Sequence, residues 1–170
     1  PPIAAFVELW GPVAELRRAW QAWPASEPAL DPELDAVRAT AWLVAERRPA
    51  DAPRTWASGE PSPGVRLVGS VHRRADLDRD AFARYWHGPH TEVARAFTIP
   101  VWRYGQNVVV EAWGPDDGED GFAVLHFRTP EALADRWARY PDEARRGAED
   151  AARFMDTARG WNVVLTETLW

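Results

Sequence analysis

Alternating apolar and polar positions predict four strands in the second half of the chain. In residues 65–72 every second position is apolar or small, and residues 101–113 form a long stretch rich in aromatic and β-branched side chains. Residues 122–127 and 162–169 show the same strand-like composition. Glycine and acidic residues dominate positions 114–121, which is typical of a turn. We therefore expect the middle two strands to form a hairpin.

The segments between these strands have apolar residues at helical spacing. A first helix is predicted from Asp76 or Asp78 to about Phe97, because either aspartate can cap it. The pair Gly88-Pro89 should interrupt this helix, since proline removes an N–H and clashes with the preceding turn. Further helix is predicted over residues 129–160, with a break at Gly147. The resulting order, β-α-β-β-α-β, is that of a ferredoxin-like α+β domain.

The first 48 residues repeat part of this pattern. A short strand over residues 3–9, a helix from Gly11-Pro12 and a strand-like segment over residues 37–44 give a β-α-β order. Positions in the two halves correspond, with Leu16, Trp20 and Trp23-Pro24 matching Leu133, Trp137 and Tyr140-Pro141. We therefore divide the chain into an N-terminal β-α-β half-repeat (1–48), a proline-rich connector (49–64) and a complete ferredoxin-like domain (65–170).

Composition narrows the classes of function. The net charge is −6, with the arginines scattered among acidic residues, so we expect no nucleic-acid partner. No apolar run approaches the roughly 20 residues that span a bilayer. No secretory signal is recognisable, and cysteine is absent, so we predict a cytoplasmic protein without disulfides or thiolate chemistry. The 11 tryptophans suit either a core short of other large residues or an apolar ligand cavity.

The four histidines are the main candidates for chemistry. His87 and His90 flank the predicted helix interruption, where an imidazole can act as general acid or base or simply satisfy a loop N–H. His72 and His126 fall near strand ends, where they either face a cavity or pack as core or interface histidines. Because Pro89 separates His87 from His90 and no metal-binding spacing is present, we predict neither a metal nor a cofactor.

A second polar group begins the long strand. The run Tyr104-Gly105-Gln106-Asn107 brings a phenol and two amides together. Such uncharged donors and acceptors are suited to orienting a carbonyl or phenol oxygen, although they also serve to cap a strand edge.

The second half of the chain resembles the EthD family of dimeric α/β-barrel proteins. The resemblance rests on several segments in the same order: Val65–Val68, Arg73–Phe82, Tyr85-Trp86 with His90, Arg103–Asn107, Gly121-Phe122 with Phe127, and Glu149–Asp156. In the family pattern the histidine precedes an Ala-Pro pair, whereas here Gly88-Pro89 precedes His90.

The resemblance implies a homodimer in which two sheets pack face to face, with a small-molecule cavity between each sheet and its helices. Together with the residues above, it predicts a cofactor-independent acid–base enzyme of the cyclase, dehydratase or decarboxylase type, acting on a small hydrophobic, aromatic or polyketide-like substrate. The expected catalytic residues are His90, Tyr104 and Asn107. The expected substrate-binding residues are His72, Trp86, His87, Trp102 and His126. A non-catalytic accessory protein that binds a small molecule and a cofactor-free monooxygenase are the alternatives.

Overall fold

A computed structural model describes residues 8–26, 40–97, 101–115 and 117–168. The chain forms two compact units: one consists of residues 1–43 and 110–117, and the other of residues 44–109 and 118–170. No helix in the described ranges is long and apolar enough to cross a membrane. The candidate site lies entirely in the second unit.

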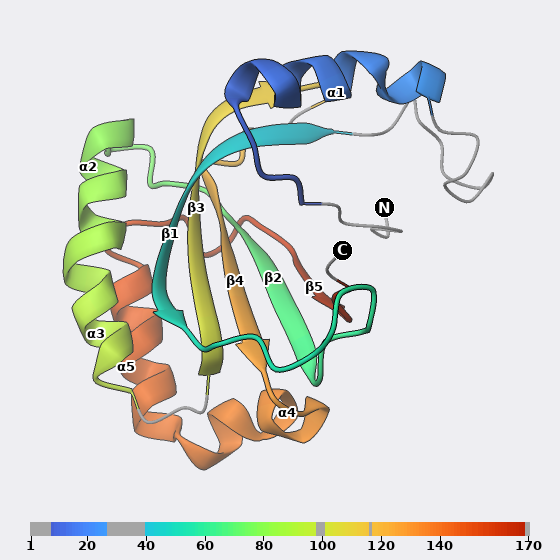
Figure 1. Cartoon of the computed structure of the whole chain (residues 1–170). Coiled ribbons are helices and arrows are strands. Elements are labelled where there is room, and N and C mark those ends of the chain that lie inside the picture. The colour runs from blue at the N-terminus through green and yellow to red at the C-terminus, as the bar shows by residue number, and fades with distance from the viewer. Residues whose placement is uncertain (1–7, 27–39, 98–100, 116, 169–170) are drawn as a thin grey trace. The chain divides into compact units, whose positions relative to one another are not determined.

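A five-stranded sheet forms the framework (Figure 1). Its strands are β1 (Ala41–Asp51), β2 (Val65–Val71), β3 (Val101–Trp113), β4 (Gly121–Phe127) and β5 (Asn162–Leu165), arranged in the order β1-β3-β4-β2-β5. Strand β4 is antiparallel to both β2 and β3, and β5 is antiparallel to β2. The four strands β3-β4-β2-β5 have the ferredoxin-like order, with β1 added beside β3. The predicted α+β, ferredoxin-like fold class and the β3–β4 hairpin are therefore confirmed.

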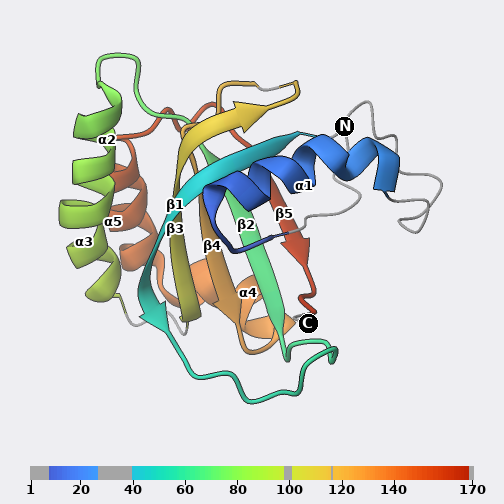
Figure 2. The ribbon, with the colours of Figure 1, turned by 45° about the horizontal axis from the view of Figure 1, so that its top comes forward.

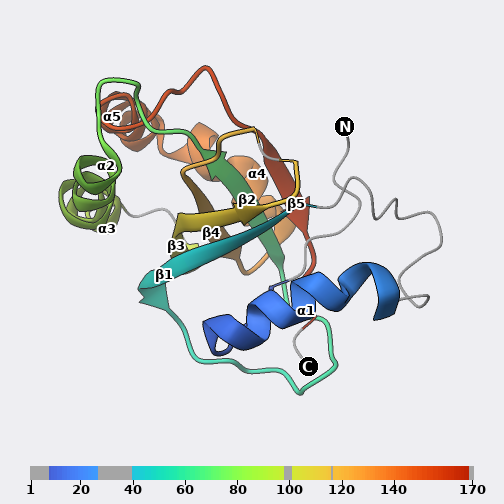
Figure 3. The ribbon, with the colours of Figure 1, turned by 90° about the horizontal axis from the view of Figure 1, so that it is seen from above.

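The helices of the second unit cover one face of this sheet (Figures 2 and 3). They are α2 (Arg79–Tyr85), the π-helical turn η2 (Trp86–His90), α3 (Thr91–Arg95), α4 (Pro130–Arg139) and α5 (Pro141–Ala151). Asp78 begins α2, because its carboxylate accepts a hydrogen bond from the N–H of Ala81 at 2.6 Å. Thr129 begins α4 in the same way through the N–H of Ala132. One face of the sheet is covered by α2, η2, α3 and α5, and we call it the helix-facing side. We call the other face the opposite side.

One of the two predicted helix interruptions is confirmed and the other is wrong. Gly88-Pro89 lies in the π-helical turn η2, which interrupts the α-helix between α2 and α3. Gly147 lies inside the continuous helix α5. A Cβ at this position would come within 3.3 Å of the Phe97 ring, so this glycine allows close packing instead of breaking the helix.

The N-terminal predictions are met in part. A helix, α1 (Val13–Ser26), follows Gly11-Pro12 as expected. The predicted strand over residues 3–9 lies mostly outside the described residues, and its described end, residues 8 and 9, is not in a strand. The strand expected at 37–44 begins at Ala41 and runs on to Asp51, into the predicted connector. In the first unit, Arg17 pairs with Glu111 at 2.5 Å and the rings of Trp20 and Trp113 stack at 6.4 Å.

Hydrophobic side chains are buried on both sides of the sheet. On the helix-facing side the core consists of Val71, Phe82, Trp86 and Phe154. On the opposite side Val68, Phe122 and Val124 are buried. Gly121 completes the first group, because a Cβ there would lie 2.4 Å from the Trp86 ring. Trp86 is thus pressed directly against the sheet.

Candidate functional site

The turn η2 owes its geometry to Pro89 and to polar side chains that meet it. Pro89 has no N–H to donate to the carbonyl four residues earlier, so the helix widens at this point. The carbonyl of Trp86, the first residue of η2, accepts side-chain hydrogen bonds from Gln106 Nε2 at 3.0 Å and Thr91 Oγ1 at 3.1 Å. Gln106 and Thr91 are fully buried. A side chain of β3 therefore fixes the turn that ends at His90.

His90 forms a close pair with an aspartate of α5. Its Nδ1 lies 2.7 Å from Oδ2 of Asp150, and Oδ1 of Asp150 accepts a hydrogen bond from the Tyr85 hydroxyl at 2.8 Å. Because a carboxylate can only accept, Nδ1 carries the proton, and Nε2 of the neutral ring has a free lone pair. Nε2 has no hydrogen-bond partner in the described part of the chain. Asp150 is buried, whereas 17% of the His90 side chain is exposed.

Aromatic rings surround this pair. The His90 ring lies 4.9 Å from the ring of Phe154, which also stacks on Tyr85 at 5.5 Å. Burial raises the pKa of Tyr85, and its hydrogen bond to Asp150 raises it further. Tyr85 is therefore a neutral phenol that donates to the carboxylate. The surroundings of His90 combine one acid–base group with an apolar wall.

Tyr104 joins this group from the sheet. Its hydroxyl oxygen accepts hydrogen bonds from Trp86 Nε1 at 3.3 Å and from Gln106 Nε2 at 3.1 Å. Burial raises the pKa of Tyr104 and outweighs the opposite effect of the hydrogen bonds from Gln106 and Trp86. Tyr104 therefore keeps its proton at neutral pH. Because two donors already occupy its oxygen, the remaining capacity of the hydroxyl is to donate.

Asn107 lies on the other side of the sheet from Tyr104. Gln106, which binds Trp86 on the helix-facing side, pairs with Ala123, whereas Asn107 pairs with Phe122 of the opposite side. The Asn107 amide donates to the Phe122 carbonyl at 3.3 Å. Side chains alternate along a strand, so Tyr104 and Asn107, three positions apart, face opposite ways. They cannot hold the same substrate oxygen.

The other predicted binding residues are also separated from His90. His126 lies on the opposite side, where its ring is 5.1 Å from Trp102. His72 bonds through Nδ1 to the Gly118 carbonyl at 2.9 Å. His72 follows Val71, whose side chain belongs to the helix-facing core, so by alternation His72 faces the opposite side of the sheet. Along the sheet it lies about 20 Å from Arg66, the β2 residue that pairs with His126. The structure therefore brings together only His90, Trp86 and Tyr104 of the predicted set, with His87 as their neighbour.

His87 belongs to η2 but points to different surroundings. Its backbone carbonyl accepts a hydrogen bond from Arg47, and its Nε2 is buried without a hydrogen-bond partner. Burial lowers the pKa of this imidazole, and the charge of Arg47 lowers it further. The ring stacks on Trp86 at 6.3 Å. His87 is thus a neutral, packed histidine.

Sequence reasoning missed the residues that support His90. Asp150, Tyr85, Gln106 and Thr91 make the hydrogen bonds that orient the pair and the turn. Asp150 and Tyr85 both lie in segments that carry the resemblance to the EthD family, and this was the signal that could have identified them.

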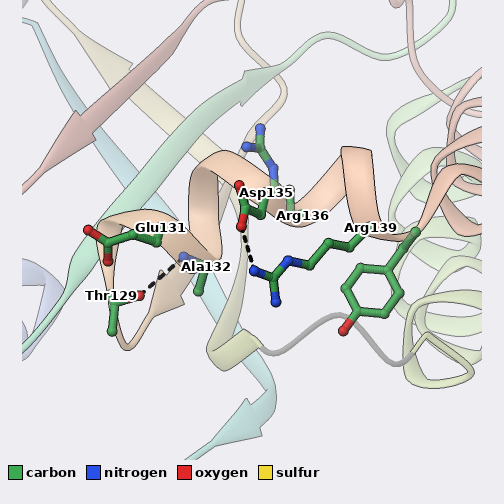
Figure 4. Close-up of a pocket in the computed structure, with 7 residues that line it drawn as sticks. Thr129, Glu131, Ala132, Asp135, Arg136 and Arg139 are labelled. Atoms are coloured by element: carbon green, nitrogen blue, oxygen red, sulfur yellow. Dashed lines mark hydrogen bonds and ion pairs between the residues drawn. The ribbon is translucent and has the colours of Figure 1, made fainter.

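A shallow hollow beside α4 does not include any of these residues. It is lined by Thr129, Glu131, Ala132, Asp135, Arg136, Arg139 and Tyr140 (Figure 4). Arg139 pairs with Asp135 at 2.8 Å across one turn of the helix. Four of its seven lining residues are charged, and none of the predicted site residues is among them.

The fold and the His90–Asp150 pair define an α+β protein with a ferredoxin-like sheet and a histidine presented at a π-helical turn. No protein-family model matches the sequence, and no curated protein matches it significantly. Among solved structures, the chain is similar to an EthD family protein from Bacillus halodurans, with 15% identity over 61% of this chain and 98% of that one and a TM-score of 0.48. It is also similar to a hypothetical protein from Arabidopsis thaliana, with 14% identity, 64% and 90% coverage and a TM-score of 0.43.

Proposed function

We propose that the chain is a cofactor-independent acid–base enzyme in which His90 transfers a proton to or from a small hydrophobic substrate. The observation that supports this role is the 2.7 Å contact between His90 Nδ1 and Asp150. It fixes the tautomer that leaves Nε2 as a base, and a carboxylate beside Nδ1 stabilises the imidazolium that forms when Nε2 takes a proton.

Tyr104 is the second proposed catalytic residue. It lies on the helix-facing side with His90, and its protonated hydroxyl can donate to the oxygen of a substrate carbonyl as an enolate develops. The phenyl ring of Phe154 next to His90 favours an apolar, aromatic substrate. An enolate held at its oxygen is common to the three reactions. Cyclisation and dehydration form it by removing a proton next to the carbonyl, whereas decarboxylation forms it by releasing carbon dioxide and then takes up a proton.

The experiment is a proton-exchange assay with aryl ketones and β-keto acids in deuterated buffer, followed by NMR. We expect exchange at the carbon next to the carbonyl, and a loss of roughly 100-fold or more in His90→Gln. Asp150→Asn should lose about tenfold or more, because the tautomer is no longer fixed. The matched control is His87→Gln, which changes a neighbouring histidine of the same turn. Equal rates in wild type and His90→Gln would rule out the catalytic role of His90.

A second candidate is a non-catalytic accessory protein that binds a hydrophobic metabolite. It is favoured by the packing of His90 against Phe154. A histidine held by a carboxylate and an aromatic ring can also form part of the wall of a binding site without transferring a proton. In that case a bound aryl ketone would undergo no exchange, and His90→Gln would only weaken binding. Oxygen consumption with a quinol would instead indicate a cofactor-free monooxygenase.

The homodimer that accompanies this proposal is tested separately. Sedimentation equilibrium of the full chain should give twice the monomer mass of 19.2 kDa. A monomeric mass together with retained proton exchange would contradict the proposed homodimer but not the proposed role of His90.

A further inference from the structure

Three aromatic rings meet on the opposite side of the sheet, away from His90. Trp56 of the segment before β2, Trp102 of β3 and His126 of β4 have ring centroids 5.4, 5.1 and 6.1 Å apart. Trp102 joins the group because the register of β3 shifts between Val101 and Arg103, which turns this side chain toward His126. All of these residues belong to the second unit.

Four buried polar atoms around these rings have no hydrogen-bond partner. They are Nε1 of Trp56, Oγ of Ser62, Nδ1 of His126 and Oε2 of Glu167. The residues are close to one another: the N–H of Ser62 donates to the Glu167 carbonyl at 2.6 Å, and Nε2 of His126 lies 2.9 Å from the carbonyl of Pro63, the next residue. Ser62, His126 and Glu167 are all more than nine-tenths buried. Leaving one such group unpaired in a protein interior costs stability, so four at one place indicate a missing partner.

The carboxylates near these four atoms already form ion pairs with arginine side chains. Glu167 pairs with Arg66 at 2.5 Å through Oε1, and its Oε2 lies 3.6 Å from Arg103. Arg103 in turn pairs with Asp51 at 3.0 Å. Asp51 also pairs with Arg48 at 3.3 Å. A ligand anion would place a second negative charge beside Glu167, and a ligand cation would compete with Arg66 and Arg103 for it, so an uncharged ligand suits these pairs best. Arg54 and Arg128, over the rings of Trp56 and Trp102 at 5.6 and 4.7 Å, are exposed to solvent.

The unpaired atoms also define which groups a ligand must carry. Because the Pro63 carbonyl can only accept, Nε2 of His126 carries the proton and Nδ1 is an acceptor. Glu167 Oε2 is a second acceptor, Trp56 Nε1 is a donor, and the Ser62 hydroxyl can be either. A ligand must therefore offer at least two hydrogens and one lone pair, next to aromatic side chains.

We propose that Trp56, Ser62, His126 and Glu167 form a second binding site, separated from His90 by the sheet, for a small uncharged ring compound with two hydroxyl groups. One hydroxyl donates to His126 and the other to Glu167, while Trp56 and Ser62 donate to the hydroxyl oxygens. The indole rings of Trp56 and Trp102, tilted 58° to each other, form the apolar wall beside the ligand.

The test uses resorcinol, with its dimethyl ether as a probe that cannot donate. Binding to the full-length chain is followed by tryptophan fluorescence and by the Nδ1 NMR signal of His126. We expect millimolar binding of resorcinol and none of the ether. Trp56→Phe and Ser62→Ala should each weaken binding about fivefold, which is the equivalent of one hydrogen bond. Ser58→Ala, an exposed serine of the same segment, and His90→Gln should bind as wild type does.

A stability measurement distinguishes this site from ordinary packing. If the Ser62 hydroxyl serves a ligand, Ser62→Ala should keep or raise the Tm of the free protein while weakening resorcinol binding. Equal binding of resorcinol and its ether, no binding to wild type, or equal affinity in wild type and Trp56→Phe would overturn the proposal. So would a crystal soaked in resorcinol in which water alone contacts the four atoms. Because His90→Gln is not expected to affect binding, failure here is independent of the proposed proton transfer.

Discussion

Two groups of buried polar side chains, one on each side of the sheet, differ in how many of their atoms are hydrogen-bonded. On the helix-facing side the carbonyl of Trp86, the hydroxyls of Thr91 and Tyr104 and the amide of Gln106 satisfy one another. On the opposite side, four polar atoms around Trp56 and His126 have no hydrogen-bond partner. A satisfied network holds a group rigidly, whereas unpaired atoms are suited to a partner that comes and goes. The first group therefore holds the turn that carries His90, and the second group is the one for which we propose a ligand.

The largest expected effect comes from breaking the satisfied network. Gln106→Leu would leave the Trp86 carbonyl short of one donor and remove a donor from Tyr104, all at a fully buried position. We expect a loss of about 3 kcal/mol in the free energy of unfolding, measured by urea denaturation. The control is Ser62→Ala on the opposite side. A loss below about 1 kcal/mol in Gln106→Leu would contradict the importance of the network.

The next effect concerns the orientation of His90. Asp150→Asn removes the carboxylate that accepts from both His90 and Tyr85, so the preference for the Nδ1–H tautomer should be lost. Nitrogen NMR of labelled imidazole distinguishes the two tautomers directly. Glu149→Gln, an exposed neighbour in α5, serves as the control. A His90 tautomer that is the same in wild type and Asp150→Asn would show that the aspartate does not position it.

A smaller effect depends on pH. Burial lowers the pKa of His126 and of His87 below their ordinary value of about 6.5. The unfolded chain therefore takes up protons first, so stability is full above about pH 6.5 and falls as the pH drops toward the folded pKa values. The free energy of unfolding should decline between about pH 7 and pH 5.5, before most carboxylates titrate. His126→Gln should reduce this slope, and an unchanged slope would place the titration elsewhere.

The smallest effect is expected at Ser62. Its hydroxyl has no partner, so Ser62→Ala should change the free energy of unfolding by no more than about 0.5 kcal/mol, or increase it. Thermal unfolding of Ser62→Ala is compared with that of Ser70→Ala. The Ser70 hydroxyl is hydrogen-bonded, because it accepts from the Trp161 N–H at 2.9 Å. Ser70→Ala should lose about 1 kcal/mol. If Ser62→Ala lost more free energy of unfolding than Ser70→Ala, the Ser62 hydroxyl would contribute more to stability than the hydrogen-bonded one, which would contradict its description as unpaired.

The strands and their order could be predicted from the sequence because alternation and turn residues are local signals. The residues 101–113 predicted for the long strand are those of β3. The interruption at Gly88-Pro89 could be predicted because proline lacks an N–H, whereas its π-helical form also depends on Gln106 of a distant strand. The continuity of α5 through Gly147 could not be predicted, since it depends on the Phe97 ring. The grouping of Tyr104 with Asn107 assumed that residues close in sequence share a site. The two residues are three positions apart in a strand, so they lie on opposite sides of the sheet.

Proton exchange by variants on the two sides tests the account most directly. In one assay, the rate for an aryl ketone is measured for wild type, His90→Gln, Tyr104→Phe and Asn107→Ser. The account predicts a loss of roughly 100-fold in His90→Gln and a clear loss in Tyr104→Phe, with Asn107→Ser close to wild type. Full exchange in His90→Gln together with a loss in Asn107→Ser would place the chemistry on the opposite side of the sheet and contradict the account.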